Sequence, residues 1–403
     1  MVDMRLTEEQ LELREITRKF CEEHLKPIAA ECDRKAHGDP SGCFPMEALK
    51  EASRLGLRTL GLPREFGGRD ISVLTHCILL EEVMAVEPGF AGVFHQLWRL
   101  LQPITAFGTE EQIKKFVVPF AGDDTCLVSV GQTEPDAGTD NTLPYGGADG
   151  GMRLSAVKRG GEWVLNGTKH FIACAALAKL FIVFGRTDTS VPVSEGVTQF
   201  LLWRDTPGFK IGRTHDKVGM AALMNAELIF ENVRVPDSDV FLGPNQGYSA
   251  KGRDFGKSTP MVACWGLGVA RGAYERALAY AREKVEGGKP LVQHDAVAMR
   301  LADMLTRIEA TRSIIWRAAA SAENLETYSL KDAVISSYMS TLCMRSVCTS
   351  AMQILGREGY MRSRPFEKLF RDGIGFYHTN STVEGRLIKT AKFAIGEKLL
   401  HVL

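Results

Sequence analysis

The residues best suited to chemistry in this sequence form one short run, Thr133-Glu134-Pro135-Asp136-Ala137-Gly138-Thr139-Asp140. Its small residues allow backbone N–H groups to approach an anionic ligand, and its hydroxyl groups can donate hydrogen bonds to a phosphate or a ring nitrogen. A Gly- and Asp-rich run of this kind also occurs as a plain turn. It is neither a P-loop nor a GxGxxG motif, so its spacing alone does not establish a phosphate site.

Three regions with different patterns of apolar and polar residues must position this run. Residues 1–124 favour helices: a capping-box pattern runs from Thr7 to Gln10, and amphipathic stretches follow at 46–55, 75–85, 91–107 and 110–120. In these stretches the apolar residues recur at helical spacing, as expected of helices that bury one face. We therefore expect an N-terminal helical domain at 1–124.

The middle of the chain has the pattern of strands, whereas its C-terminal part has the pattern of long helices. A hairpin is expected at 152–166 around the turn at 159–161, with short apolar strands at 180–184, 198–203 and 227–230. Long helices are expected at 261–284, 292–324, 330–355 and 382–400. The pattern predicts a β domain at 125–240 and a four-helix bundle at 241–403.

Composition narrows the class of protein. The 403 residues include 49 Lys+Arg and 49 Asp+Glu, so the formal charge is zero, which argues against a nucleic-acid or polybasic membrane-surface protein. The nine cysteines are scattered and form no CxxC pair, which predicts free thiols and no metal site. No signal peptide and no membrane span are expected. We expect a soluble protein of the cytoplasm or another reducing compartment.

Four further segments, together with the first run, carry a resemblance to a known family. They are Asn166-Gly167-Thr168-Lys169-His170-Phe171-Ile172, then Asn232-Val233-Arg234-Val235-Pro236, then Gln353-Ile354-Leu355-Gly356, and Arg371-Asp372 near the end. In this order and spacing, the sequence resembles the acyl-CoA dehydrogenase flavoprotein family over nearly its whole length. The resemblance implies a mainly helical α+β fold: an N-terminal helical domain, a small β-barrel domain and a C-terminal four-helix bundle.

The resemblance also implies a cofactor, partners and the residues that meet them. FAD is expected between the β domain and the bundle of a homotetramer, with an acyl-CoA substrate and an electron-transfer flavoprotein as a partner. Residues at the expected FAD site are Thr133 (flavin ring), Thr139 (pyrophosphate), Phe171 (flavin face), Lys284 (phosphates), Gln353 and Gly356 (a neighbouring subunit's FAD) and Thr382.

Several positions depart from the family pattern. The usual Trp-Ile-Ser/Thr run is replaced by Phe171-Ile172-Ala173, so the shielding ring remains but the hydroxyl that donates to the flavin is lost. Lys284 stands where an arginine is common, which keeps the charge but loses the bidentate fork. Gly287 replaces a stacking phenylalanine.

The largest departure concerns the catalytic base. The family removes the α-proton of the thioester with a glutamate, and counting from Arg371-Asp372 without gaps places Asn380 at that position. A carboxamide cannot act as a general base at neutral pH. A gapped alignment places Glu384 there instead. Some family members carry the base on the helix near position 258, where this sequence reads Lys257-Ser258-Thr259-Pro260 and has no carboxylate either.

Three other residues are candidates for chemistry. Arg99 lies in the segment that lines the acyl end of the pocket in this family, where it would be either a surface residue or a guanidinium that holds an anion. His95, one turn earlier, would be a packed imidazole or a base. Asp254 would be a helix-start aspartate or a base.

Four functions follow from these residues. The first is an FAD-dependent acyl-CoA dehydrogenase of an unusual acyl-CoA, which performs α,β-dehydrogenation. The second is non-oxidative elimination or desulfination on a CoA thioester. The third is a base-lacking partner subunit of a heteromeric dehydrogenase, and the fourth is an oxidase similar to nitroalkane oxidase.

Overall fold

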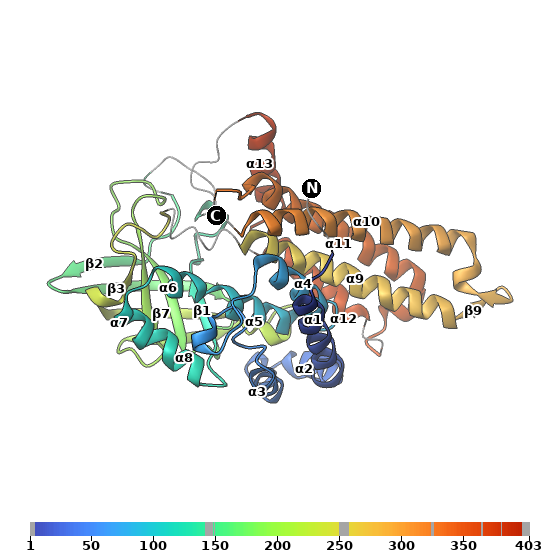
Figure 1. Ribbon diagram of the computed structural model, residues 1–403, viewed down its shortest axis with the longest axis horizontal. Coiled ribbons are helices and arrows are strands. Elements are labelled where there is room, and N and C mark those ends of the chain that lie inside the picture. The colour runs from blue at the N-terminus through green and yellow to red at the C-terminus, as the bar shows by residue number, and fades with distance from the viewer. Residues whose placement is uncertain are drawn as a thin grey trace.

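The fold was obtained as a computed structural model, which describes residues 5–141, 148, 150–249, 258–323, 326–363, 366–379 and 381–396. The β sheet lies at one end of the molecule and long helices extend from it to the other end (Figure 1). The N-terminal helices pack between these two parts. The expected fold class, mainly helical with a central sheet and C-terminal helices, is confirmed.

The N-terminal part begins as its sequence predicts. The hydroxyl of Thr7 accepts a hydrogen bond from Gln10 N, and the Gln10 side chain accepts one from Thr7 N, so the first turn of α1 is capped from both sides. The expected helix at 91–107 is instead two helices, because Pro103 falls within the first turn of the second one. The helices are α1 Glu8–Phe20, α2 Ala29–Ala36, α3 Met46–Arg54, α4 Val73–Met84, α5 Pro88–Arg99, α6 Gln102–Phe107, α7 Glu110–Gln112 and α8 Val118–Gly122.

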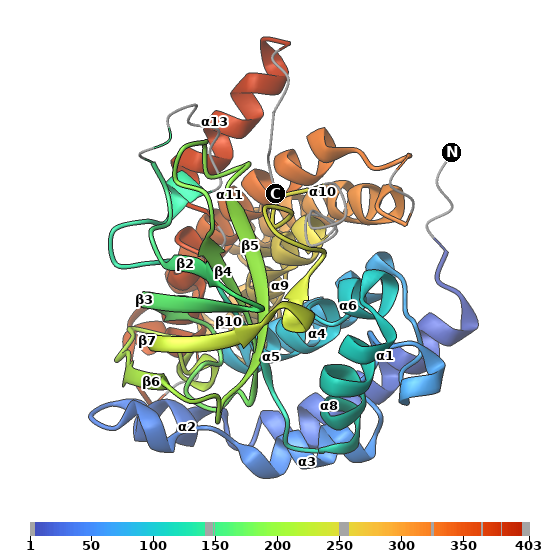
Figure 2. The same cartoon turned by 90° about the vertical axis from the view of Figure 1, so that its left-hand side faces the viewer.

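The middle part is one eight-stranded sheet in the order β6-β7-β3-β2-β4-β5-β8, with β1 beside β4. The strands are β1 Val128–Gly131, β2 Ser155–Arg159, β3 Glu162–Ile172, β4 Leu180–Arg186, β5 Val197–Trp203, β6 Phe209–Thr214, β7 Ala226–Pro236 and β8 Val240–Phe241. The hairpin expected at 152–166 is present as β2 and β3, whose antiparallel register pairs Arg159 with Glu162. Figure 2 shows the sheet with the helices behind it.

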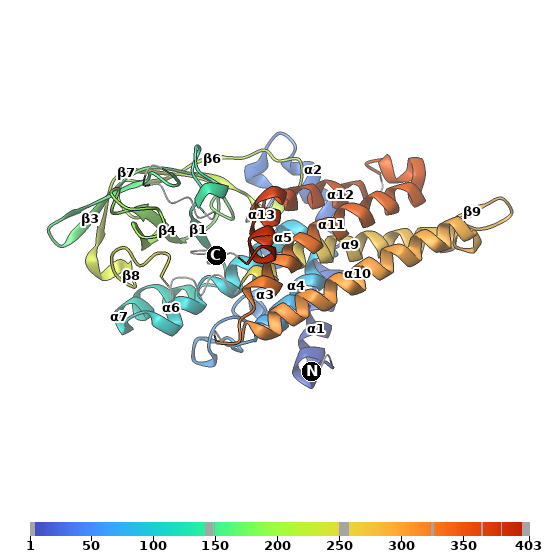
Figure 3. The same cartoon turned by 90° about the horizontal axis from the view of Figure 1, so that it is seen from above.

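The C-terminal part contains three long helices that pack on one another, α9 Thr259–Glu283, α10 Asp295–Ser321 and α11 Leu330–Leu355. Two shorter helices follow, α12 Phe366–Ile374 and α13 Val383–Ala394, which pack on α9 and α11 respectively. A short hairpin, β9 Val285–Glu286 with β10 Lys289–Pro290, joins α9 to α10 at the end remote from the sheet (Figure 3). None of the helices in the described part of the chain has the length and hydropathy of a membrane span.

The helix α4 joins the N-terminal part to the bundle. Nearly all of its residues are buried, and it packs against α9, α5 and α1. Its acidic side chains Glu81 and Glu82 pair with Arg271 of α9 and with Arg312 of α10. The pairs satisfy charges that would otherwise be costly to bury.

Candidate active site

A buried ion pair braces the Thr133–Asp140 run after strand β1. The Glu134 carboxylate accepts hydrogen bonds from Arg153 N at 2.6 Å, Leu154 N at 2.8 Å and Lys169 Nζ at 2.7 Å. Lys169 is fully buried on β3, and burial lowers its pKa to about 8 although Glu134 opposes the change. Both residues lie inside the motifs noted in the sequence, but their mutual contact could not be seen there. The brace fixes this run against the β2–β3 hairpin.

Thr133 of this run is left available for a ligand. Thr133 is half-buried, its carbonyl accepts a hydrogen bond from His170 N at 2.8 Å, and its hydroxyl forms none with any residue that the structure describes. Asp140 accepts from Gly138 N and from Gly151 N, which shapes the turn around Thr139. The run is therefore a loop held by several hydrogen bonds, in which the half-buried Thr133 hydroxyl can still bind a ligand.

The start of helix α13 comes to the same place from the other end of the chain. Thr382 caps α13, and its hydroxyl accepts from Gly385 N at 3.0 Å. A Cβ on Gly385 would stand 3.0 Å from Thr139 Cγ2, so the two segments touch. The Ser381 hydroxyl beside them is buried and has no hydrogen-bond partner among the described residues. Thr139 and Thr382, both predicted to meet FAD, are thus brought together.

This junction fits the phosphate end of a dinucleotide. The N-terminus of a helix favours an anion, because its first N–H groups have no partner within the helix. The orphaned Ser381 hydroxyl adds a donor, and only glycine at position 385 allows the close approach to Thr139. These features suit FAD, which is the cofactor expected from the sequence.

Phe171, next to the last residue of strand β3, is exposed. Its φ of +56° is in the left-handed region, which is costly for an aromatic residue. The ring stacks on His215 at 4.3 Å between centroids, Phe171 N donates to His215 Nε2, and the carbonyl accepts from Asn225 Nδ2 at 2.8 Å. These contacts hold the strained backbone, and 52% of Phe171 remains exposed for a ligand.

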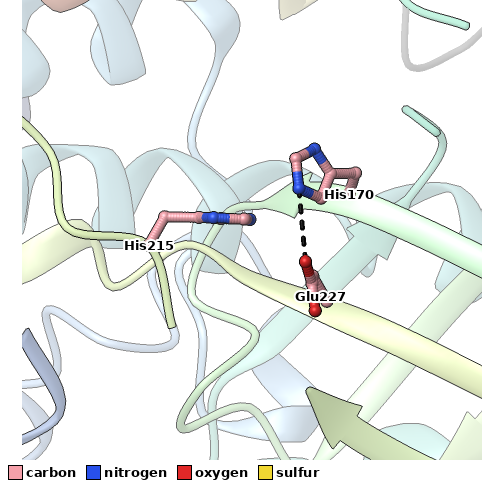
Figure 4. A group of neighbouring side chains, drawn as sticks. All are labelled: His170, His215 and Glu227. Atoms are coloured by element: carbon pink, nitrogen blue, oxygen red, sulfur yellow. Dashed lines mark ion pairs between the residues drawn. The ribbon is translucent and has the colours of Figure 1, made fainter. Parts of the chain in front are cut away.

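Two histidines and a glutamate gather beside Phe171 (Figure 4). His170 of β3, His215 after β6 and Glu227 of β7 each offer a ligand atom within 4.8 Å of the other two, which a metal ion would require. In the structure His170 Nε2 lies 3.4 Å from Glu227 Oε1, and burial together with His170 lowers the pKa of His215. This group gives no signal in the sequence, because its members come from three separate segments. Its observed contacts are those that support Phe171.

Three expected FAD residues lie elsewhere, at the end of the bundle remote from the sheet. Lys284 ends α9 beside the β9–β10 hairpin, where its Nζ is 3.8 Å from Glu286 Oε1. Gln353, near the end of α11, is hydrogen-bonded to Arg300 of α10, and Gly356 follows with a φ of +56°. Figures 1 and 3 both show this hairpin far from the sheet. Within one chain these residues do not join Thr133 and Thr139.

The candidates for catalysis are placed as follows. Asn380 and Asp254 lie outside the described residues. Glu384 is exposed on the first turn of α13. His95 is buried on α5, in edge contact with Trp265 of α9 at 5.6 Å between ring centroids. Burial, Arg99 and His76 all lower the pKa of His95 well below its ordinary value.

Arg99 ends α5 in the interior of the molecule. The residue is partly exposed, but its Nε is buried. Among the described residues that nitrogen has no hydrogen-bond partner, and the one hydrogen bond of the side chain runs from a terminal nitrogen to Gln96 Oε1 at 2.8 Å. Burial lowers its pKa to about 10. Arg99 is therefore not the surface arginine that the sequence left open as one alternative.

Comparison with known proteins matches three family models along the chain. They are the N-terminal domain of acyl-CoA dehydrogenase at residues 7–124, the middle domain at 129–233 and the C-terminal domain at 245–376. The chain is 32% identical to the short-chain specific acyl-CoA dehydrogenase of Clostridium acetobutylicum over 92% of its own length and 94% of that protein. It is also 32% identical to the mitochondrial short-chain specific acyl-CoA dehydrogenase of Bos taurus, over 89% and 84% of the two chains.

A solved structure gives the same result. The butyryl-CoA dehydrogenase of Megasphaera elsdenii superposes with a TM-score of 0.87 at 31% identity, covering 98% of this chain and all of that one. The three family models follow one another along the chain in the order of the helical, sheet and helical parts described above. The chain therefore belongs to the acyl-CoA dehydrogenase family of oxidoreductases.

Proposed function

We propose that this protein is an FAD-dependent acyl-CoA dehydrogenase that forms a 2,3-double bond in an acyl-CoA thioester. The observation that carries the proposal is the junction of Thr139 with Ser381, Thr382 and Gly385. It joins the sheet to the last helix, as a cofactor between these two parts would require. FAD, when bound, supplies the acceptor for the hydride of the β-carbon.

The chain's own residues would hold this cofactor as follows. Thr133 would donate to the flavin ring, Phe171 would cover one face of it, and Thr139 with the start of α13 would bind the pyrophosphate. Lys284, Gln353 and Gly356 support a shared site. Lys284 flanks the β9–β10 hairpin and Gln353 is bonded to Arg300 near it, at the end of the bundle remote from the sheet (Figures 1 and 3). A second copy of the chain would therefore complete each site, and we propose a homotetramer.

The α-proton requires a base, and Asn380 cannot accept it. We propose that Glu384 takes the proton. Glu384 is the candidate carboxylate on the turn that approaches Thr139. His95 is a poor candidate because burial and the positive charge of Arg99 keep its imidazole neutral and weakly basic.

Flavin absorbance tests the proposal. Acyl-CoA esters added anaerobically to the FAD-loaded protein should bleach the flavin band, and product analysis should find the 2,3-enoyl-CoA. Asn380→Glu should raise the bleaching rate, whereas Glu384→Gln should lower the rate of the native protein by about 100-fold or more, as expected for loss of a general base. A product of unchanged redox state would instead indicate elimination or desulfination.

An unchanged rate in Glu384→Gln would refute the role of Glu384 alone. Absence of bleaching with every acyl-CoA, while FAD stays bound, would refute the dehydrogenase proposal. We propose electron-transfer flavoprotein as the partner that reoxidises the flavin. The nine cysteines are all unpaired, which supports a reducing compartment such as the cytoplasm.

A further inference from the structure

Three polar groups without hydrogen-bond partners gather where α5 meets the start of α9. They are Arg99 Nε, His95 Nδ1 and Trp265 Nε1, all buried and unpaired among the described residues. His95 and Arg99 are four residues apart on α5 and so share one face of that helix. Trp265 contacts His95 from α9. Because buried polar groups are almost always paired in folded proteins, three orphans side by side indicate a binding site.

Other buried arginines in the described part of the chain each have several acceptors, although Arg186 Nη1 and Arg271 Nε, like Arg99 Nε, have no hydrogen-bond partner there. Arg58 donates to Ser53 Oγ and to the carbonyls of Cys126 and Ala121. Arg386 donates to Thr341 Oγ1 and to the carbonyls of Phe376 and Thr379. Arg271 pairs with the carboxylates of Glu81 and Glu82. Arg99, with Gln96 as its one acceptor, is the exception among these four.

The orphaned groups also share one chemical character. A guanidinium and an indole N–H only donate hydrogen bonds, and a neutral imidazole can donate one as well. No carboxylate of the described residues forms an ion pair with Arg99. A group that accepts several hydrogen bonds and carries a negative charge would satisfy all three donors, and a carboxylate has the right number of lone pairs.

The position of these donors ties them to the proposed active site. Arg99 is near enough to Cys174 for its charge to act on that thiol, and Cys174 directly follows Phe171-Ile172-Ala173. A Cβ on Gly92, one turn before His95, would stand 3.0 Å from the Trp265 ring and 2.8 Å from Leu223. Leu223 in turn accepts a hydrogen bond from Cys174 N, so the donors lie close to the segment that carries Phe171.

On the basis of the proposed dehydrogenase function, we propose that the substrate's acyl group ends in a carboxylate, which Arg99 binds with His95 and Trp265. The substrate class is then the mono-CoA ester of a dicarboxylic acid. The thioester end is oxidised, and the distant carboxylate anchors the chain without taking part in bond changes. Arg99 is thus a specificity-determining residue.

Binding measurements on the FAD-loaded protein test this assignment. Succinyl-, glutaryl- and adipyl-CoA are compared by anaerobic titration calorimetry with their ω-amides, which have the same shape without the charge. At least one dicarboxylic ester should bind about 10- to 100-fold more tightly than its amide, as a charge-assisted hydrogen-bonded pair would give. The same panel is then followed by flavin bleaching.

Two variants and a control assign the preference to Arg99. Arg99→Gln should bind acid and amide equally, and Arg99→Lys should keep part of the preference, because it retains the charge but not the fork. Arg64→Gln, which removes an arginine with 75% of its side chain exposed, should leave the preference unchanged. Melting temperature and FAD content show whether each variant is folded.

The outcomes separate the two proposals. If the native protein binds every amide as tightly as its acid, or if Arg99→Gln keeps the full preference, the carboxylate assignment is overturned, whatever the bleaching shows. If the acids bind preferentially through Arg99 but no ester bleaches the flavin, the anion site stands and the dehydrogenase function fails. If neutral acyl-CoAs bleach the flavin and no acid is preferred, the dehydrogenase function stands and the carboxylate assignment fails.

Discussion

Removal of the positive charge from the buried pair of Lys169 and Glu134 should loosen the loop that carries Thr133 and Thr139. The Lys169 side chain is fully buried and donates to Glu134 Oε1 at 2.7 Å and to Gln132 O at 3.1 Å. In Lys169→Met, Glu134 becomes a buried carboxylate with no cation, although the two backbone N–H groups of Arg153 and Leu154 still donate to it. The effect should therefore appear first in the loop.

The magnitude follows from the remaining partners. Breaking a buried ion pair by removal of one member costs about 3–5 kcal/mol. Because Glu134 keeps two of its three hydrogen bonds, we expect a value near the lower limit, about 3 kcal/mol. The control is Lys179→Met, in which the lost partner, Asp123, is 38% exposed, so the expected cost is at most about 1 kcal/mol.

Two assays report on this change. Hydrogen exchange should become faster in peptides that cover residues 131–141 and 152–155, and the melting temperature should fall further than in the control. The variant should also release FAD more readily, as measured by flavin fluorescence after dilution. If Lys169→Met matches Lys179→Met in both exchange and melting temperature, the ion pair does not brace the loop and the reasoning is refuted.

Three further changes should have measurable effects. His76 is fully buried, and its ring nitrogens have no hydrogen-bond partner in the described part of the chain. Burial lowers its pKa from 6.5 to about 3, so the native protein loses stability as pH falls below 6.5. Relative to the native protein, His76→Phe should gain about 2 kcal/mol of stability between pH 7.5 and pH 5 in urea unfolding. Lys368→Met leaves Glu87 and Asp372 buried without their shared cation, which should cost about 3–5 kcal/mol and lower the melting temperature. Gly385→Ala should weaken FAD binding in equilibrium titration, because its new methyl group would press on the loop beside it.

The long helices and the hairpin could be predicted because their signals are local. The helix at 330–355 is observed with the bounds that its periodicity gives, and α9 differs by two residues at its start. Strands β1 and β6 were not expected, since each is short and is held by distant partners, β4 and β7. The short helix α12 was missed for a similar reason, because it packs on α9.

The candidate site was only partly visible in the sequence. Thr133 and Thr139 were assigned to FAD through the resemblance of their run to the family, but the contact of Thr139 with Gly385 joins segments 246 positions apart in the chain. Trp265 lies in an apolar helix and gave no signal, because its role depends on facing His95. Contacts of this kind depend on the tertiary packing of elements, which no local pattern contains.

The separation of the expected FAD residues has a genetic consequence. Thr139 and Thr382 lie beside the sheet, whereas Gln353 and Gly356 lie at the remote end of the bundle, so in the proposed homotetramer each cofactor would draw on two chains. A chain defective at Thr139 and a chain defective at Gln353 would each be inactive alone. Co-expressed in one cell, they would form mixed assemblies in which some sites receive both intact halves. Two loss-of-function alleles of this gene would then complement each other.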